Sequence, residues 1–103
     1  MKELKDYEGR IVRFSQERLA HVLSHPELTE HEDWVTNTLL HPEEVRYSIS
    51  DRMVKLFYRF YPNTKVGNKW LCVVAKYLDD DAFVITAYLT DKFKRGDSIW
   101  PNP

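Results

Sequence analysis

Four polar side chains in the second half of the sequence have the chemistry needed to hold a phosphodiester. Arg59 and Lys76 are cations within apolar runs, and Thr86 and Tyr88 supply a hydroxyl and a phenol within a third run, FVITAYLTD (83–91). An arginine binds a phosphate through two parallel hydrogen bonds, whereas a lysine acts as a point charge. These side chains suit phosphodiester chemistry, provided that the fold brings them to one surface.

The runs that carry these residues read as β-strands, in which alternate side chains share a face. We expect strands over 53–61, 70–78 and 83–91, paired antiparallel because short turns join them. The residues that we assign to the core face are Val54, Leu56, Tyr58, Phe60, Leu71, Val73, Ala75, Tyr77, Phe83, Ile85, Ala87 and Leu89. The opposite face then receives the two cations, the hydroxyl and the phenol.

Two interpretations of this opposite face stay open. Phe57 and Trp70 lie on it, where their rings could stack unpaired bases beside the cations. Alternatively, the face is simply solvated, as one face of an antiparallel sheet often is, and its cations serve only solubility.

Four histidines, His21, His25, His31 and His41, lie in the first half of the sequence. His21 and His25 are four residues apart on a predicted helix, a spacing that can chelate a metal with His31 or Glu27 as a further ligand. The alternatives are solvated or capping histidines, or a catalytic acid or base role for one of the pair. His41 precedes a proline and marks a helix end.

The elements that must position these residues form an α+β pattern. Ser15 predicts the start of a helix over 16–24, and Thr29 with Glu32 forms a capping box for a second helix over 30–40. From residue 45 the apolar period changes to two, which adds a possible strand over 45–50. We expect one domain, residues 1–103, with two N-terminal helices packed on one face of a curved four- to five-stranded antiparallel sheet. Trp100, in the tail, should pack back on this domain.

Composition excludes several classes of protein. The 103 residues are 43% hydrophobic, enough for a core, and the net charge of -1 gives no overall attraction to a polyanion. Cys72 is the single cysteine, so a reducing compartment is expected. The sequence shows no signal-peptide pattern and no apolar run long enough to span a bilayer. We therefore expect a soluble, cytoplasmic protein without a membrane partner.

Five segments occur in an order that resembles a family of small nucleases. They are RLAHVLSHPEL, TLLHPEEVRYS, KLFYRFY, LCVVAKY and FVITAYLTDKFKRGDSIW, and they span most of the chain, from about Arg18 to Trp100. Their order and spacing are similar to those of the phage- and bacteria-associated barnase–EndoU–colicin–RelE-like nucleases. The resemblance implies a RelE/barnase-like fold and a metal-independent endoribonuclease, without cofactor, in which the ribose 2′-hydroxyl attacks and leaves a 2′,3′-cyclic phosphate.

The resemblance also implies a toxin or phage-conflict context, with RNA as substrate and an antitoxin or immunity protein as a possible partner. The matching polar positions are His21, Arg59, Lys76, Thr86 and Tyr88. On this hypothesis Tyr88 or His21 is the general acid or base, the two cations neutralise the phosphate, and Thr86 positions a phosphate oxygen. Lys92, Lys94 and Arg95 would then guide flanking phosphates. The alternative is a non-catalytic binding module that uses the same sheet face for a protein or nucleic-acid partner.

Overall fold

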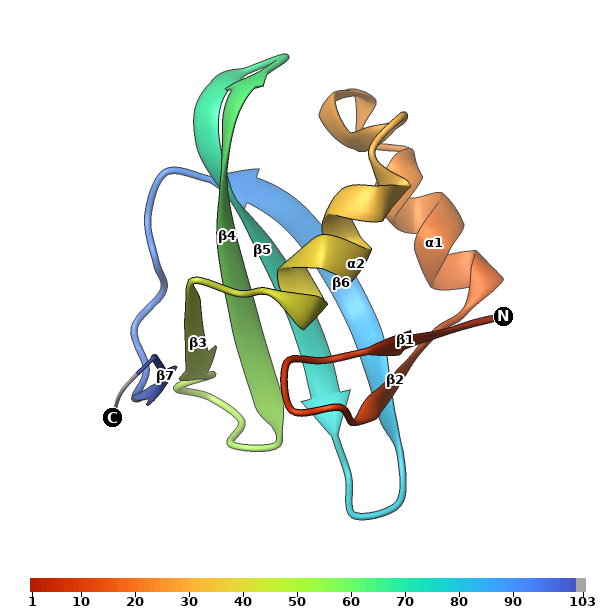
Figure 1. The fold of residues 1–103 in the computed structure, drawn as a ribbon, viewed down its shortest axis with the longest axis vertical. Coiled ribbons are helices and arrows are strands. Elements are labelled where there is room, and N and C mark those ends of the chain that lie inside the picture. The colour runs from red at the N-terminus through yellow and green to blue at the C-terminus, as the bar shows by residue number, and fades with distance from the viewer. Residues whose placement is uncertain (102–103) are drawn as a thin grey trace.

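The computed structural model describes residues 1–101. Two α-helices pack against one open sheet of seven strands, in the order β1-β2-β6-β5-β4-β3-β7 (Figure 1). The elements are β1 Lys2–Lys5, β2 Ile11–Phe14, α1 Gln16–Leu23, the 3-10 turn η1 Pro26–Leu28, α2 Glu32–Leu40, β3 Glu44–Tyr47, β4 Val54–Thr64, β5 Gly67–Tyr77, β6 Ala82–Thr90 and β7 Ser98–Trp100. All neighbouring strands are antiparallel except β2 and β6. The predicted α+β class is confirmed, but the sheet is larger than predicted and mixed.

The two helices begin differently from each other. Ser15 caps α1 as expected, since its hydroxyl accepts a hydrogen bond from the Arg18 amide at 3.2 Å. The predicted Thr29 cap is wrong, because the Thr29 hydroxyl instead donates to the carbonyls of Leu23 and His25. The proline-initiated turn η1 occupies this segment, and α2 therefore starts at Glu32. Within residues 1–101 no helix is long and apolar enough to cross a membrane.

The face of the sheet that contacts the helices, here called the helix-side face, holds the main core. Phe57 of β4 lies opposite Val73 of β5, which lies opposite Ala87 of β6, and all three are fully buried. Odd-numbered residues of β4 therefore point toward the helices. The prediction that Val54, Leu56, Tyr58 and Phe60 do so is wrong.

Two β-bulges explain this error. At the turn, Thr64 pairs with Gly67, a register that would have placed the even residues of β4 on the helix side. A bulge between Tyr61 and Thr64 shifts the pairing by one residue, and a one-residue shift moves every later side chain to the other face. A second shift in pairing occurs between Val74 and Ala75 of β5. It moves the side chains of β6 that precede Thr86 to the opposite faces of the sheet. The predicted core positions of Ala87 and Leu89 are confirmed, whereas Ile85 packs on the opposite face and Phe83 lies on that face opposite Lys76.

The opposite face, here called the outer face, carries a second apolar cluster. Leu56, Tyr58 and Cys72 are buried in it. The loop between β6 and β7 (residues 91–97) crosses over part of this face, and its Phe93 ring lies 4.4 Å from the Tyr58 ring and 4.7 Å from the Trp70 ring, between centroids. The outer face is therefore only partly open to solvent.

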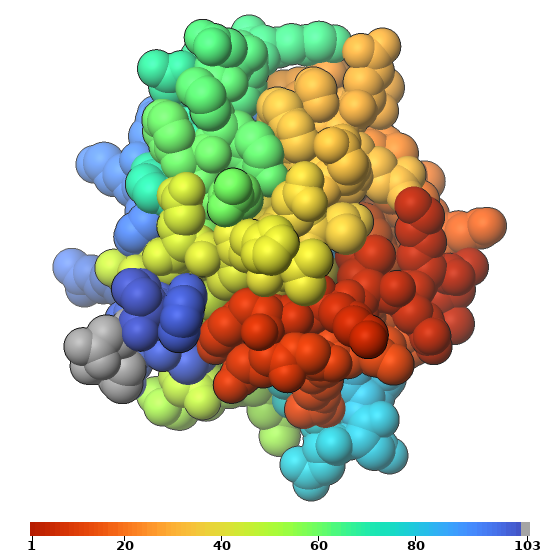
Figure 2. Space-filling view, viewed as in Figure 1, coloured from red at the N-terminus to blue at the C-terminus, as the bar shows by residue number. Residues whose placement is uncertain are grey.

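A hairpin of β1 and β2 closes one end of the helix-side face. Its turn is organised by Asp6, which is only 2% exposed. One carboxylate oxygen accepts from the amides of Glu8 and Arg10, at 2.9 Å each, and the other accepts from the Tyr77 hydroxyl at 2.6 Å. These bonds fix the hairpin tip over the sheet. In Figure 2 the hairpin, the end of α2 and β7 meet on one side of the molecule.

Candidate functional site: the helix-side cleft

The fold does not bring the predicted catalytic residues together. Arg59 is an odd-numbered residue of β4 and therefore lies on the helix-side face. Its cross-strand neighbour Leu71 is part of the core on that face. Lys76, Thr86 and Tyr88 lie on the outer face, since β5 and β6 pair there through Val74 and Cys72. His21 is exposed on α1. The predicted convergence on one sheet face is therefore wrong for Arg59 and for His21.

The outer-face members of the predicted set have other surroundings. Lys76 forms an ion pair with Asp51, at 3.4 Å. The Tyr88 hydroxyl is buried and has no hydrogen-bond partner among the residues that the structure describes. Burial raises the pKa of Tyr88 above its ordinary value, so the phenol stays protonated at neutral pH and does not serve as a base there. Thr86 is half-buried opposite Val74.

The predicted RNA-contacting residues are also divided. Phe57 is fully buried beneath the hairpin, so no base can stack on it, and this prediction is wrong. Trp70 is half-buried on the outer face against Phe60 and Phe93. Lys92, Lys94 and Arg95 are exposed on the loop that crosses the outer face. These three residues keep the surface position that was expected of them, on the side of the sheet away from Arg59.

His21 of α1 and His25, which directly precedes η1, lie near each other without a third ligand in the described part of the chain. The rings of His21 and His25 lie 5.6 Å apart between centroids. Within the described part of the chain, no group of three or more His, Cys, Asp or Glu side chains is placed to hold a metal ion. The ring of His31 is instead stacked on Trp34, at 3.7 Å between centroids.

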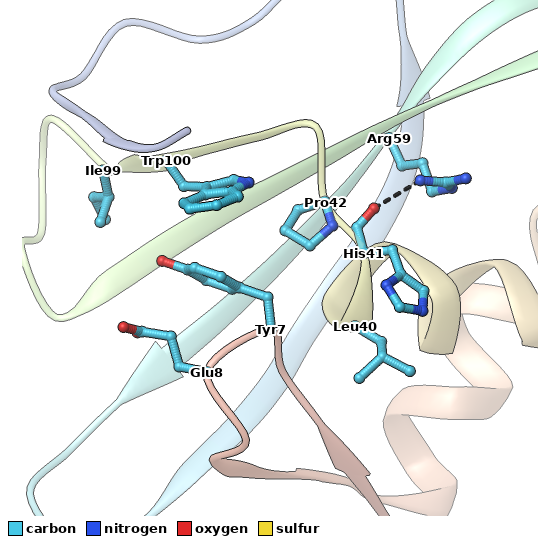
Figure 3. Close-up of a pocket in the computed structure, with 8 residues that line it drawn as sticks. All are labelled: Tyr7, Glu8, Leu40, His41, Pro42, Arg59, Ile99 and Trp100. Atoms are coloured by element: carbon cyan, nitrogen blue, oxygen red, sulfur yellow. Dashed lines mark hydrogen bonds between the residues drawn. The ribbon is translucent and has the colours of Figure 1, made fainter. Parts of the chain in front are cut away.

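A cleft of about 620 Å³, here called the helix-side cleft, lies where the hairpin tip, the end of α2, β4 and β7 meet (Figure 3). It is formed by segments from both ends of the sequence. Its lining residues are Tyr7, Glu8, Leu40, His41, Pro42, Arg59, Ile99 and Trp100. The lining mixes apolar and polar side chains, and the volume lies within the range of small-molecule and substrate sites.

One end of this cleft carries the Arg59 cation and His41. The Arg59 guanidinium donates to the His41 carbonyl at 2.7 Å, at the end of α2 where the helix dipole favours a cation. Arg59 forms no ion pair with any residue of the described chain. A guanidinium has five N–H donors, so donors remain for an anion. Figure 3 shows the His41 imidazole on the same side of the cleft as Arg59.

The aromatic end of the cleft is formed by Trp100 and Tyr7. Their rings are 5.4 Å apart, and Trp100 is 41% exposed, so it offers a free ring surface. Burial and the neighbouring Glu8 and Asp6 carboxylates raise the pKa of Tyr7 to about 12, so its hydroxyl stays a hydrogen-bond donor. In Figure 3 the Glu8 carboxylate lies at this end, away from Arg59. The cleft is therefore polarised, with positive charge at one end and negative charge at the other.

The sequence pattern identifies Arg59 as a candidate site residue but not its neighbours in the cleft. The pattern indicates only a helix end at His41, although this residue follows α2 with its side chain exposed. Trp100 was expected to pack back on the domain, which its contact with Tyr7 confirms. Nothing in the spacing of Tyr7 and Glu8 indicates that a hairpin carries them across the sheet.

Comparison of the chain with protein-family models, with curated proteins and with solved structures finds no match.

Proposed function

We propose that this protein is a metal-independent endoribonuclease that acts in the helix-side cleft. The observation that carries the proposal is an arginine with no ion-pair partner among residues 1–101, which lies beside an exposed histidine at one end of the helix-side cleft, with an exposed tryptophan at its other end. A cation, a proton-transfer group and a stacking surface are the three elements that cleavage of single-stranded RNA requires. The resemblance of the sequence to RelE/barnase-like nucleases supports the same chemistry.

Arg59 would bind the scissile phosphate and stabilise the charge that develops on its oxygens in the transition state. The imidazole of His41 would take the proton from the ribose 2′-hydroxyl as its oxygen attacks the adjacent phosphorus. The bond from phosphorus to the 5′-oxygen then breaks, and that oxygen takes a proton from water, because the cleft is open to solvent. The products are a 2′,3′-cyclic phosphate and a free 5′-hydroxyl.

The polarity of the cleft sets the direction of the RNA. A phosphate is attracted to Arg59 and repelled by Glu8, so the scissile group belongs at the end of α2. The base of a neighbouring nucleotide would stack on Trp100, an interaction worth about 1–3 kcal/mol per base. An unpaired strand is required, because bases within a duplex are not free to stack on a protein side chain.

The proposal is tested with the purified protein, excess EDTA and a short single-stranded RNA carrying a fluorophore at each end. We expect cleavage that EDTA does not abolish, and products that end in a cyclic phosphate. The matched substrate carries a single 2′-deoxynucleotide at the mapped cleavage position. That substrate should bind but stay intact, since the attacking hydroxyl is missing. Binding of RNA without cleavage of either substrate would contradict the proposal and leave a non-catalytic binding module.

A further inference from the structure

A second cleft, of about 410 Å³, lies on the outer face of the sheet and is separate from the helix-side cleft. Its floor is apolar and is formed by Val54, Leu56 and Val74. Ile49 lines its edge and is 74% exposed. Val54 and Leu56 are only 8% and 3% exposed, so Ile49 is the most exposed apolar side chain of this cleft.

The charge around this outer cleft has one sign. Lys94 and Arg95 line it, and no acidic residue does. The neighbouring Lys76 and Asp51 form an ion pair with each other, so they add no net charge. Lys94 is held in place at its backbone: its amide donates to the Tyr58 hydroxyl at 2.9 Å, and its carbonyl accepts from Arg46 at 3.0 Å. The excess positive charge thus belongs to a fixed segment rather than to a freely moving loop.

We propose that the outer cleft binds a segment of a partner protein in which acidic and aliphatic side chains alternate. The apolar floor would take the aliphatic side chains, and Lys94 with Arg95 would face the carboxylates at the rim, where complementary charge sets specificity and the rate of association. A nucleic acid fits this cleft less well, because no aromatic side chain lines it. The aromatic rings of the outer face, Tyr58, Trp70 and Phe93, pack against one another instead.

The probe is a random-peptide phage library selected against the wild-type protein. The most frequent peptide is then synthesised with a fluorophore, and its affinity is measured by fluorescence anisotropy. We expect peptides rich in Asp or Glu between Leu, Ile or Phe, and an affinity that falls as salt screens the charges. The double variant Lys94→Glu with Arg95→Glu should weaken binding by roughly 10-fold or more, because it places like charges together.

Lys92→Glu is the matched control, since it reverses one charge of the same loop at a residue that does not line the cleft. It should leave the affinity of the peptide within roughly 2-fold of wild type. Recovery of peptides without acidic residues, equal loss in the control, or recovery of no peptide would overturn the proposal. Binding of a short RNA that is lost in the double variant would overturn it in favour of a nucleic-acid track. RNA cleavage at the helix-side cleft is measured separately, so either proposal can fail alone.

Discussion

Tyr77→Phe and Tyr88→Phe each remove one hydroxyl group, but we expect only Tyr77→Phe to lower the stability of the fold. Tyr77→Phe removes the hydroxyl that donates to the Asp6 carboxylate at 2.6 Å. Tyr88→Phe removes a buried hydroxyl that has no hydrogen-bond partner within residues 1–101. The two changes are chemically identical, so the difference between them reports the environment alone.

The change in unfolding free energy depends on which polar atoms each substitution leaves buried without a hydrogen bond. Asp6 is 2% exposed, so after Tyr77→Phe one of its carboxylate oxygens stays buried without a donor. A hydrogen bond to a charged group contributes about 1.5–3 kcal/mol to the free energy of unfolding. A domain of this size loses roughly 4 °C or more per kcal/mol, so the Tm should fall by roughly 6 °C or more. Tyr88→Phe relieves the desolvation of a buried hydroxyl that faces the weakly hydrogen-bonding Cys72 thiol, so its Tm should stay close to that of wild type or rise.

The assay is urea and thermal unfolding of wild type and both variants at neutral pH, followed by circular dichroism. Tyr77→Phe should also loosen the hairpin that carries Tyr7 and Glu8, which hydrogen exchange of the Glu8 and Arg10 amides would detect. Equal loss of stability in the two variants would refute the assignment of the Asp6 bond as the element that holds the hairpin. A large loss in Tyr88→Phe alone would refute the claim that its hydroxyl is unpartnered.

Three further predictions concern other parts of the fold. The Arg13 guanidinium lowers the pKa of Asp81 through two hydrogen bonds, so this stabilisation is present above about pH 4 and is lost as the pH falls through the lowered pKa. The difference in unfolding free energy between wild type and Arg13→Gln should therefore shrink between about pH 6 and about pH 2, and a constant difference would argue against it. Burial raises the pKa of the Cys72 thiol, so the native protein should react with a thiol reagent only on unfolding; fast labelling of the native protein would contradict this. Gly96→Ala would place a methyl group 1.9 Å from the Tyr47 carbonyl oxygen, at a φ of +147°, and should cost about 1–3 kcal/mol in urea unfolding; an unchanged midpoint would show that β7 is not held there.

The class of fold could be predicted because it depends on local signals. The change from helical to alternating periodicity locates α1, α2 and the long strands β4, β5 and β6 to within a few residues. The Ser15 cap is a local interaction and was correct. The short strands β1 and β7 were missed, since each has four residues or fewer and owes its existence to pairing with distant segments.

The candidate site could not be predicted because it depends on register. Both faces of β4 are apolar, with Phe57 on one and Tyr58 on the other, so alternation does not show which face is buried by the helices. The bulges in β4 and β6 decide that question. Pro62 and Asn63 lie at the first bulge, where Asn63 has a φ of 59°, and such residues signal an irregular strand, whereas no comparable residue lies at the second. As a result Arg59 was paired with the wrong neighbours. The cleft around it joins residues from near both ends of the chain, which only the tertiary structure brings together.

The central claim is that Arg59 and His41 cleave RNA together, and the rate of cleavage by their variants tests it most directly. We expect Arg59→Ala and His41→Gln each to lower kcat/KM on the labelled RNA by roughly 10²–10³-fold, with unfolding midpoints close to wild type. Arg18→Ala, which removes an exposed arginine of α1, should retain full activity. Undiminished cleavage by both cleft variants, or its loss in His21→Gln instead, would contradict this account.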